Sequence, residues 1–170
     1  MHTINAKPMV LTGVFIALTI LFTYVFSIQT PFVRLSFGFL PIAVYAAMFG
    51  TLRGGIMAAT ADILGMALFP TGAYFPGFTL SSFLSGCIYG YFLHRQSLTF
   101  QRISIPFLLI FTCIDLGLNT LWLSILYQKA ASAFFISRLI KNLICLPINI
   151  LLFSAVYRPI SLFLPKITSK

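Results

Sequence analysis

The chain has little charge and almost no acid. Only 8% of its 170 residues are charged, against roughly 25% in soluble domains, so they cannot clothe a water-facing surface. Asp62 and Asp115 are its only acidic residues, and no GxxxxGK[ST] phosphate-binding loop occurs. The composition therefore excludes a soluble domain and any nucleotide-hydrolysing machinery of the chain's own, and an energy source must lie in a partner.

Cysteine is scarce too, and its spacing carries no motif. Cys87, Cys113 and Cys145 all lie inside apolar segments, are odd in number and show no CxxC spacing. Neither a disulfide framework nor a metal site is indicated, and we interpret these cysteines as packing residues.

What the chain has instead is apolar and aromatic surface. Hydrophobic residues make up 59% and aromatic residues 16% of it, and the mean hydropathy is +1.02. A membrane helix takes about 20 apolar residues, so six helices need about 120 and leave some 50 for connections. We predict an all-α membrane protein with one integral membrane domain over residues 1–170. The apolar runs between charges and Pro or Gly predict spans at about 9–27, 37–50, 54–70, 78–94, 104–127 and 133–157.

The basic residues predict sidedness. The net charge of +9 would suggest nucleic acid in a soluble chain, but here the charges fall singly between apolar stretches and favour membrane topology, with no nucleic-acid partner. With the N-terminus inside, seven of the eleven basic residues lie at the inner side: Lys7, Arg53, Arg95, Arg102, Arg158, Lys166 and Lys170. The other four are Arg34, Lys129, Arg138 and Lys141. This distribution predicts both termini in the cytoplasm and a retained first helix.

The predicted outer connections have an unusual composition. Residues 28–36 contain Gln29, Pro31 and Arg34, and residues 70–77 are rich in turn-formers and aromatics, with Tyr74 and Phe75 at the centre. Such loops suit a lid over an outward-facing cavity. The alternative is an ordinary interfacial turn whose aromatics lie in the membrane belt.

Several polar residues fall in one layer of the predicted bundle. At 1.5 Å per residue, Asp62, Asn119, Trp122, Arg138 and Lys141 all lie within about 12 Å of the outer boundary. Ionisable groups in a membrane helix cost about 2.5–3.5 kcal/mol each, so they need partners or a solvated cavity. Asp115 is expected to lie too deep to pair with the cations of this layer. The outer half then lacks negative charge, which predicts a bound anion, and Arg grips a carboxylate bidentately.

The same residues could instead have purely structural roles. Arg138 and Lys141 would then snorkel to the membrane surface, with Asp62 as a salt-bridge partner. Asn119, Asn142 and Asn149 would serve only as hydrogen bonds between helices.

Two stretches of the sequence are similar to a known family. RLSFGFLPIAVYAAMFG from Arg34 to Gly50 and ADILGMALFPTGAYFPGFTLSSFLSGCIYGYFL from Ala61 to Leu93, with NTLWLSILYQKA and RLIKN further on, resemble the substrate-binding S components of energy-coupling factor (ECF) vitamin transporters, specifically the folate-type group. The resemblance implies a six-helix membrane subunit of an ABC transporter, in the plasma membrane of a prokaryote. It captures the vitamin from outside with high affinity and delivers it by reorienting in the membrane.

The resemblance also implies partners. A shared module would hold a transmembrane coupling (T) subunit and two ATPases, which use ATP and Mg²⁺, so this chain needs no cofactor. In the family a small-residue motif on the first helix forms the docking surface, and Gly13 with Ala17 takes that place here. Gly stands where the first Ala of the motif is usual.

A folate suits the candidate residues chemically. A pterin presents an amino group and a ring N–H side by side, which a carboxylate accepts bidentately, and Asp62 is the candidate acceptor. The two tail carboxylates suit Arg34 and either Arg138 or Lys141. We expect the remaining contacts to be aromatic stacking and further hydrogen bonds. The stacking candidates are Tyr74, Phe75, Phe78 and Trp122, and the hydrogen-bonding candidates are Ser82, Asn119 and Asn142.

Three other hypotheses compete. An S component for another anionic vitamin, such as pantothenate, needs no acid opposite a pterin. An intramembrane aspartyl protease of the lipoprotein signal peptidase type would use Asp62 and Asp115, but a dyad needs both acids at one depth and helix rise separates these by about 6 Å. A purely structural membrane subunit would bind no small molecule saturably.

Overall fold

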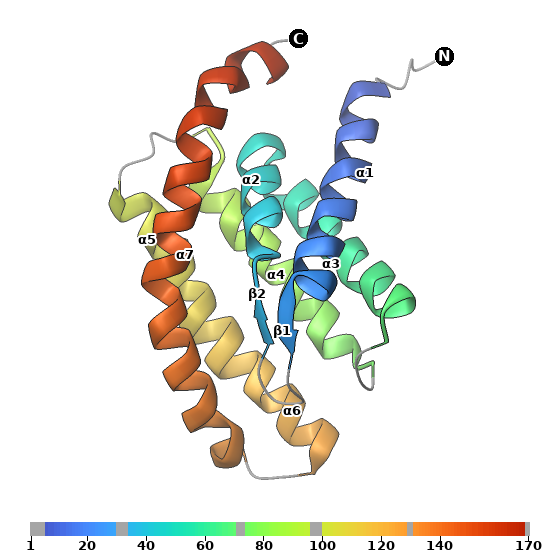
Figure 1. Ribbon diagram of the computed structural model, residues 1–170, viewed down its shortest axis with the longest axis vertical. Helices are drawn as coiled ribbons and strands as arrows, with labels where there is room; N and C mark the ends of the chain where they lie inside the picture. The colour runs from blue at the N-terminus through green and yellow to red at the C-terminus, as the bar shows by residue number, and fades with distance from the viewer. Residues whose placement is uncertain (1–5, 30–33, 71–73, 96–99, 129–130, 169–170) are drawn as a thin grey trace.

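The computed structural model describes residues 6–29, 34–70, 74–95, 100–128 and 131–168, and those residues form six helical runs and a two-stranded ribbon (Figure 1). The first run is α1 (Ala6–Ile20) with the π-helical η1 (Leu21–Val25), followed by the ribbon strands β1 (Ser27–Gln29) and β2 (Arg34–Ser36). Next come α2 (Phe39–Phe49), α3 (Thr51–Leu68) and α4 (Pro76–Leu93). The fifth run is α5 (Phe100–Leu109), the π-helical η2 (Ile110–Leu118) and α6 (Asn119–Tyr127), and the sixth is α7 (Ala131–Thr168).

Each helical run overlaps one predicted apolar segment, with two differences. The helix predicted to end near residue 157 continues to Thr168, and the predicted connection 28–36 contains the antiparallel ribbon, in which Ser27 pairs with Ser36 and Gln29 with Arg34. Within the described residues, three stretches are long and apolar enough to cross a membrane: Pro8–Val25, Gln101–Tyr127 and Arg138–Tyr157. Crossing by the shorter runs remains a prediction.

The two termini lie at one end of the bundle, away from the ribbon and from two of the helix connections. Figure 1 shows α1 beginning and α7 ending at the same end of the bundle. The ribbon runs from the middle of the bundle into the opposite half, where the helix ends flanking the α3–α4 and α6–α7 connections also lie. If the termini are cytoplasmic, as predicted, this opposite end faces outwards.

Local sequence explains where helices start, stop and change pitch. Pro76 begins α4, where its missing N–H costs nothing. Gly50, at φ +92°, allows the abrupt turn between α2 and α3, since other residues are strained there. Pro106 lies inside α5, one turn before the nine-residue π segment η2. The N–H of Asn119 bonds to the carbonyl of Ile114, five residues back, so this run does not keep α-helical periodicity.

Close helix contact is built on glycines between α3 and α4. A Cβ at Gly55 would lie 2.5 Å from Cys87 Sγ, and one at Gly90 would lie 2.5 Å from the Cα of Thr51. A Cβ at Gly86 would collide with the carbonyl oxygen of Gly54. Small residues let helix backbones approach in a membrane, where no hydrophobic force drives helices together. The two helices therefore form one wall of the bundle.

Replacing Gly86 with Ala tests this packing. The added methyl group meets backbone rather than a movable side chain, so we expect a destabilisation of about 1–3 kcal/mol, measured by thermal unfolding in detergent. Gly13→Ala is the matched control because nothing lies within 4 Å of a Cβ there. An unchanged Gly86→Ala protein would contradict the close contact.

Candidate functional site

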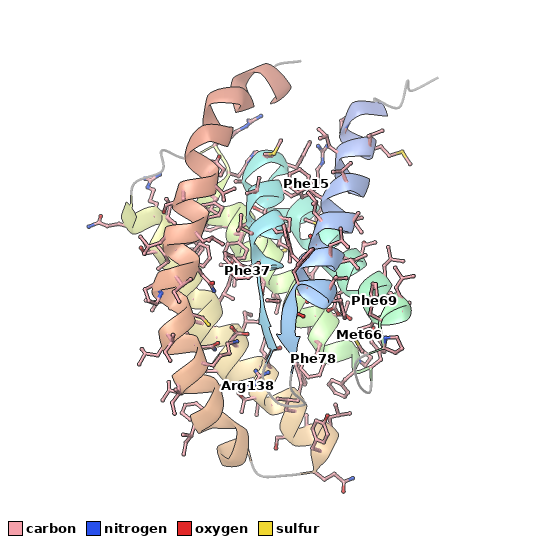
Figure 2. The ribbon with its side chains drawn as sticks, in the orientation of Figure 1. Phe15, Phe37, Met66, Phe69, Phe78 and Arg138 are labelled. Atoms are coloured by element: carbon pink, nitrogen blue, oxygen red, sulfur yellow. The ribbon has the colours of Figure 1, made fainter. Side chains whose placement is uncertain are left out.

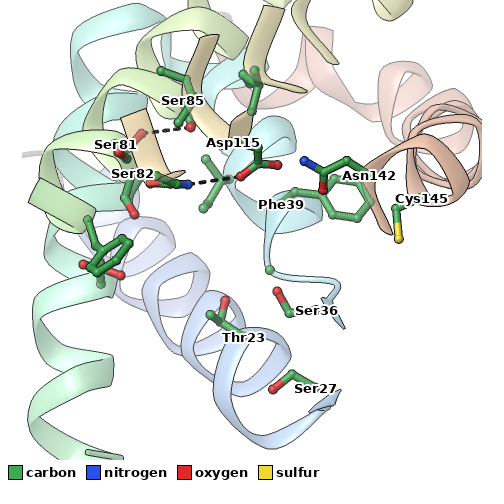
Figure 3. A pocket seen from close by; sticks show the side chains of 18 of the residues that line it. Thr23, Ser27, Ser36, Phe39, Ser81, Ser82, Ser85, Asp115, Asn142 and Cys145 are labelled. Atoms are coloured by element: carbon green, nitrogen blue, oxygen red, sulfur yellow. Dashed lines mark hydrogen bonds between the residues drawn. The ribbon is translucent and has the colours of Figure 1, made fainter. Parts of the chain in front are cut away.

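A large cavity opens inside the bundle between the helices and the ribbon. Its volume is about 1300 Å³, and all six helical runs and both flanks of the ribbon line it. Figure 3 shows side chains from several elements directed into this space, among them Ser82 of α4, Asp115 of η2 and Asn142 of α7. Figure 2 shows Phe78 and Arg138, two lining residues, in the half of the bundle away from the termini.

Asp62 lines the cavity from α3 and is held by neighbours. Thr79 donates a hydrogen bond of 2.8 Å to Asp62 Oδ2, and the hydroxyl of Tyr74 lies 3.1 Å from Thr79 Oγ1. Tyr24 donates to the backbone carbonyl of Asp62 at 3.4 Å. The carboxylate is thus oriented beside the connection between α3 and α4.

Asp115 organises a second polar group across the cavity. Asn119 donates through Nδ2 to Asp115 Oδ1 at 3.1 Å, and Arg138 donates from a terminal guanidinium nitrogen to the Asp115 backbone carbonyl at 2.9 Å. The Arg138 contact is to the backbone carbonyl of Asp115 and not to its carboxylate, so the expectation that this acid lies too deep to pair with the outer cations stays a prediction. The long Arg138 side chain carries its guanidinium well away from its own Cα, which lets it reach this carbonyl on the neighbouring helical run.

Three buried polar atoms of this group have no hydrogen-bond partner among the residues that the structure describes. They are Asn119 Oδ1, Arg138 Nε and Asn142 Nδ2, and Asn142 is only 4% exposed. A buried polar atom left unpaired costs about 1–3 kcal/mol, so native proteins rarely keep several together without a ligand or ordered water. All three residues line the cavity, so this group of unpaired polar atoms indicates a place for a polar ligand or ordered water.

The sixth helical run presents two consecutive residues to the cavity. Lys141 and Asn142 both line it, although consecutive helical residues differ by about 100° in direction. The sequence left open which of them faces inwards, and the structure shows that the cavity is wide enough to meet both.

Aromatic side chains lie near the α3–α4 connection. Phe75 and Phe78 line the cavity with an edge-to-face contact of 6.2 Å between ring centroids, and Tyr74 lines it too. Trp122, expected to stack on a ligand, is not among the lining residues. Its indole packs at 5.6 Å from the ring of Phe75 and donates to Ser81 Oγ at 3.1 Å. The π segment before α6 changes the helical phase, which turns Trp122 towards α4 and makes it a support for Phe75.

Sequence reasoning missed the contribution of the first helical run. Thr19 of α1 and Thr23 of η1 line the cavity, and so do Ser27 of β1 and Ser36 of β2. Part of the signal was present, because positions 19 and 23 follow an i, i+4 spacing that places polar side chains on one helical face, whereas Ser27 already belongs to β1.

Other predicted residues fall outside this group. The structure describes Arg34 only as backbone in β2, so its predicted contact with a carboxylate stays a prediction. Gly13 and Ala17 are exposed on α1, away from the cavity. Among the described residues, no three His, Cys, Asp or Glu side chains gather as they do around a bound metal.

Comparison with known proteins decides the family. Residues 3–160 match the model of the family described as "ECF-type riboflavin transporter, S component". The chain belongs to the ECF-type S components. These are membrane transport subunits, so the chain is not an enzyme and the aspartyl protease hypothesis is wrong. The prediction of an all-helical membrane protein of this type is confirmed.

Curated relatives and a solved structure agree with this family. The folate transporter FolT of Clostridium novyi (strain NT) is 44% identical over 145 residues, covering 85% of this chain and 84% of the relative. The FolT of Leuconostoc mesenteroides subsp. mesenteroides is 30% identical over 154 residues, covering 86% and 82%. A crystal structure of FolT bound with folic acid is similar with a TM-score of 0.86 at 40% identity, covering 89% of this chain and 93% of that one. The resemblance to folate-type S components is thereby confirmed.

Replacing Asn142 with Leu tests whether its amide serves a ligand. Because Asn142 Nδ2 has no hydrogen-bond partner within the described part of the chain, we expect the thermal unfolding midpoint to stay unchanged or rise. Ser81→Ala is the contrasting variant. It leaves the buried indole N–H of Trp122 without its acceptor, which should cost about 1–3 kcal/mol. A marked fall for Asn142→Leu would show that the amide has a structural role instead.

Proposed function

We propose that this chain is the high-affinity folate-binding S component of an ECF-type transporter. The observation that carries the proposal is one cavity that joins an oriented carboxylate and aromatic rings to a polar group, Asn119, Arg138 and Asn142, in which each side chain has one buried atom without a partner among the described residues. The names of the two FolT relatives and of the FolT structure with folic acid support the same vitamin.

The two halves of a folate differ as the cavity walls do. The pterin would place its adjacent N–H donors on Asp62 and its rings against Phe75 and Phe78, with Ser82 as a further hydrogen-bonding group. The glutamyl tail would place its carboxylates towards Arg138 and Lys141, and Arg34 of the ribbon is the third candidate cation. The unpaired atoms of Asn119 and Asn142 would bind polar atoms of the ligand, which removes the cost of their burial.

Two other vitamins fit this cavity less well. Riboflavin, which appears in the description of the matching family model, has no carboxylate to meet Arg138 and Lys141. Pantothenate has a carboxylate but no paired N–H donors to use Asp62. Only a ligand with both features uses both walls, which favours folate.

The transport cycle requires partners. The chain would dock on a T subunit carrying two ATPases that use ATP and Mg²⁺, and would lie as a multi-pass protein in the cell membrane with cytoplasmic termini. Docking is assigned to Gly13 and Ala17 because both are exposed on α1 and nothing lies within 4 Å of a Cβ at Gly13. The neighbouring Val10 and Val14 are 64% and 49% exposed, so the face is apolar and flat enough for another helix.

Calorimetric titration of folate into the detergent-purified chain tests the vitamin and its anchor. We expect one-to-one binding, and about ten- to a hundredfold weaker binding by Asp62→Asn because an amide cannot accept both pterin donors. Asp115→Asn is the matched carboxylate-to-amide control, and its folate affinity should fall less than that of Asp62→Asn.

Riboflavin, pantothenate and thiamine serve as ligand controls in the same titrations. Heat from one of them with none from folate would overturn the vitamin assignment. A loss confined to Asp115→Asn would keep the vitamin and move the pterin anchor to Asp115. If a folded sample gives no binding heat with any of these vitamins, the result would favour a structural subunit.

Gly13→Trp tests the docking surface. The indole has open space within the chain, so we expect folate binding in detergent to be unchanged and folate uptake by cells expressing the complete transporter to be lost. Leu143→Trp, at a 66% exposed position on α7, is the matched control and should transport normally. Normal uptake by Gly13→Trp would place the docking surface elsewhere.

A further inference from the structure

A short chain of hydrogen bonds links the α3–α4 connection to Asp62. The hydroxyl of Tyr74 lies 3.1 Å from Thr79 Oγ1, and Thr79 donates to Asp62 Oδ2 at 2.8 Å. A threonine hydroxyl has one hydrogen, which Thr79 gives to the carboxylate. Tyr74 must therefore be the donor in its contact with Thr79, and the chain runs in one direction from Tyr74 through Thr79 to Asp62.

Thr79 supports the carboxylate from outside the cavity. Asp62 and Tyr74 are lining residues, whereas Thr79 is not among them. Thr79 belongs to the first turn of α4, and α4 is fixed against α3 by the contacts at Gly55 and Gly86. The hydroxyl that holds Asp62 is thus attached to the same rigid wall as Asp62 itself.

We propose that Thr79 is a positioning residue that sets the orientation of the Asp62 carboxylate for its ligand, and that the Tyr74 hydroxyl supports this orientation through Thr79. The inference rests on the proposed function, in which Asp62 receives the paired donors of the pterin. A carboxylate binds two parallel donors only when its plane faces them, so a fixed plane removes a cost that binding would otherwise carry. Without the Thr79 hydroxyl, rotation about the Asp62 side chain is less restricted.

The same geometry gives Tyr74 a role different from stacking. Its ring is 49% exposed, and its hydroxyl supplies a directed hydrogen bond. The placement of Tyr74 and the orientation of Asp62 therefore support each other, because the Thr79 hydroxyl bonds to both.

Thr79→Val and Thr79→Ser separate the hydroxyl from the shape of the side chain. Valine keeps the shape and loses the hydroxyl, so we expect folate to bind about tenfold more weakly, the scale of one hydrogen bond to a charged group. Serine keeps the hydroxyl and should bind as the unmodified chain does. Thr60→Val is the matched control on α3, since that hydroxyl bonds only to the backbone carbonyl of Ile56 at 2.8 Å, and its affinity should not change.

A double-mutant cycle shows whether Thr79 acts through Asp62. In an Asp62→Asn background, Thr79→Val should cause no further loss of folate affinity, because the amide has already lost the interaction that Thr79 prepares. Full additivity of the two losses would overturn the proposal, and so would equal affinities for Thr79→Val and the unmodified chain. Weak binding by Thr79→Ser would show that the methyl group, and therefore packing, is what matters.

Tyr74→Phe tests the first hydrogen bond of the series from Tyr74 to Asp62. Tyr74 is exposed, so this substitution should not disturb folding. It keeps the ring and removes the donor, so we expect weaker folate binding by about threefold and no added effect of Thr79→Val. Unchanged folate affinity would show that the Tyr74 hydroxyl does not help to orient Asp62 and that Tyr74 contributes only its ring. If the unmodified chain does not bind folate, the proposed function fails; if it binds folate and these variants do also, only the present inference fails.

Discussion

The solvent around this chain is hydrocarbon, and that constraint shapes every other feature. Backbone N–H and C=O groups find no water in a membrane, so helices that pair them internally make up nearly all of the described residues. Polar side chains meet the same penalty and must turn inwards. The large exposed side chains of α7 are accordingly apolar, such as Leu143 and Leu151 at 66% and 65%, while Asn142 is 4% exposed. The cavity is where the polar side chains displaced from lipid collect.

Two walls of different construction enclose that cavity. Close packing at Gly55, Gly86 and Gly90 joins α3 to α4, so the carboxylate of Asp62 and the hydroxyl of Thr79 are held on a common frame. The opposite wall carries the Asp115 group, whose hydrogen bonds leave three buried atoms unpaired. A fully paired wall would need no ligand. This wall has two donors and one acceptor without a partner among the described residues, as expected of a site whose polar groups are completed by a ligand.

The helices were predictable because the apolar runs are long and Pro, Gly and basic residues interrupt them. The ribbon was not, since strands of three residues are too short for an alternating pattern to appear. Trp122 was misplaced for a local reason. An α-helical period and a depth per residue were applied across residues 110–118, where the structure has a π-helix. The polar pair Thr19 and Thr23, four residues apart, was visible in the sequence, but the prediction rested mainly on ionisable groups.

Sequence alone determined that the chain lies in a membrane, that six helical runs form, and that a few ionisable residues would need an internal partner, because composition and the cost of charge in lipid are properties of the residues themselves. Tertiary structure alone decided which polar groups meet. Only the packing of α3 on α4 places Thr79 against Asp62, seventeen residues away, and only the approach of α7 to η2 brings Arg138 to the carbonyl of Asp115. Hydrogen bonds act over about 3 Å, so they depend on helix rotation and register that no apolar run specifies.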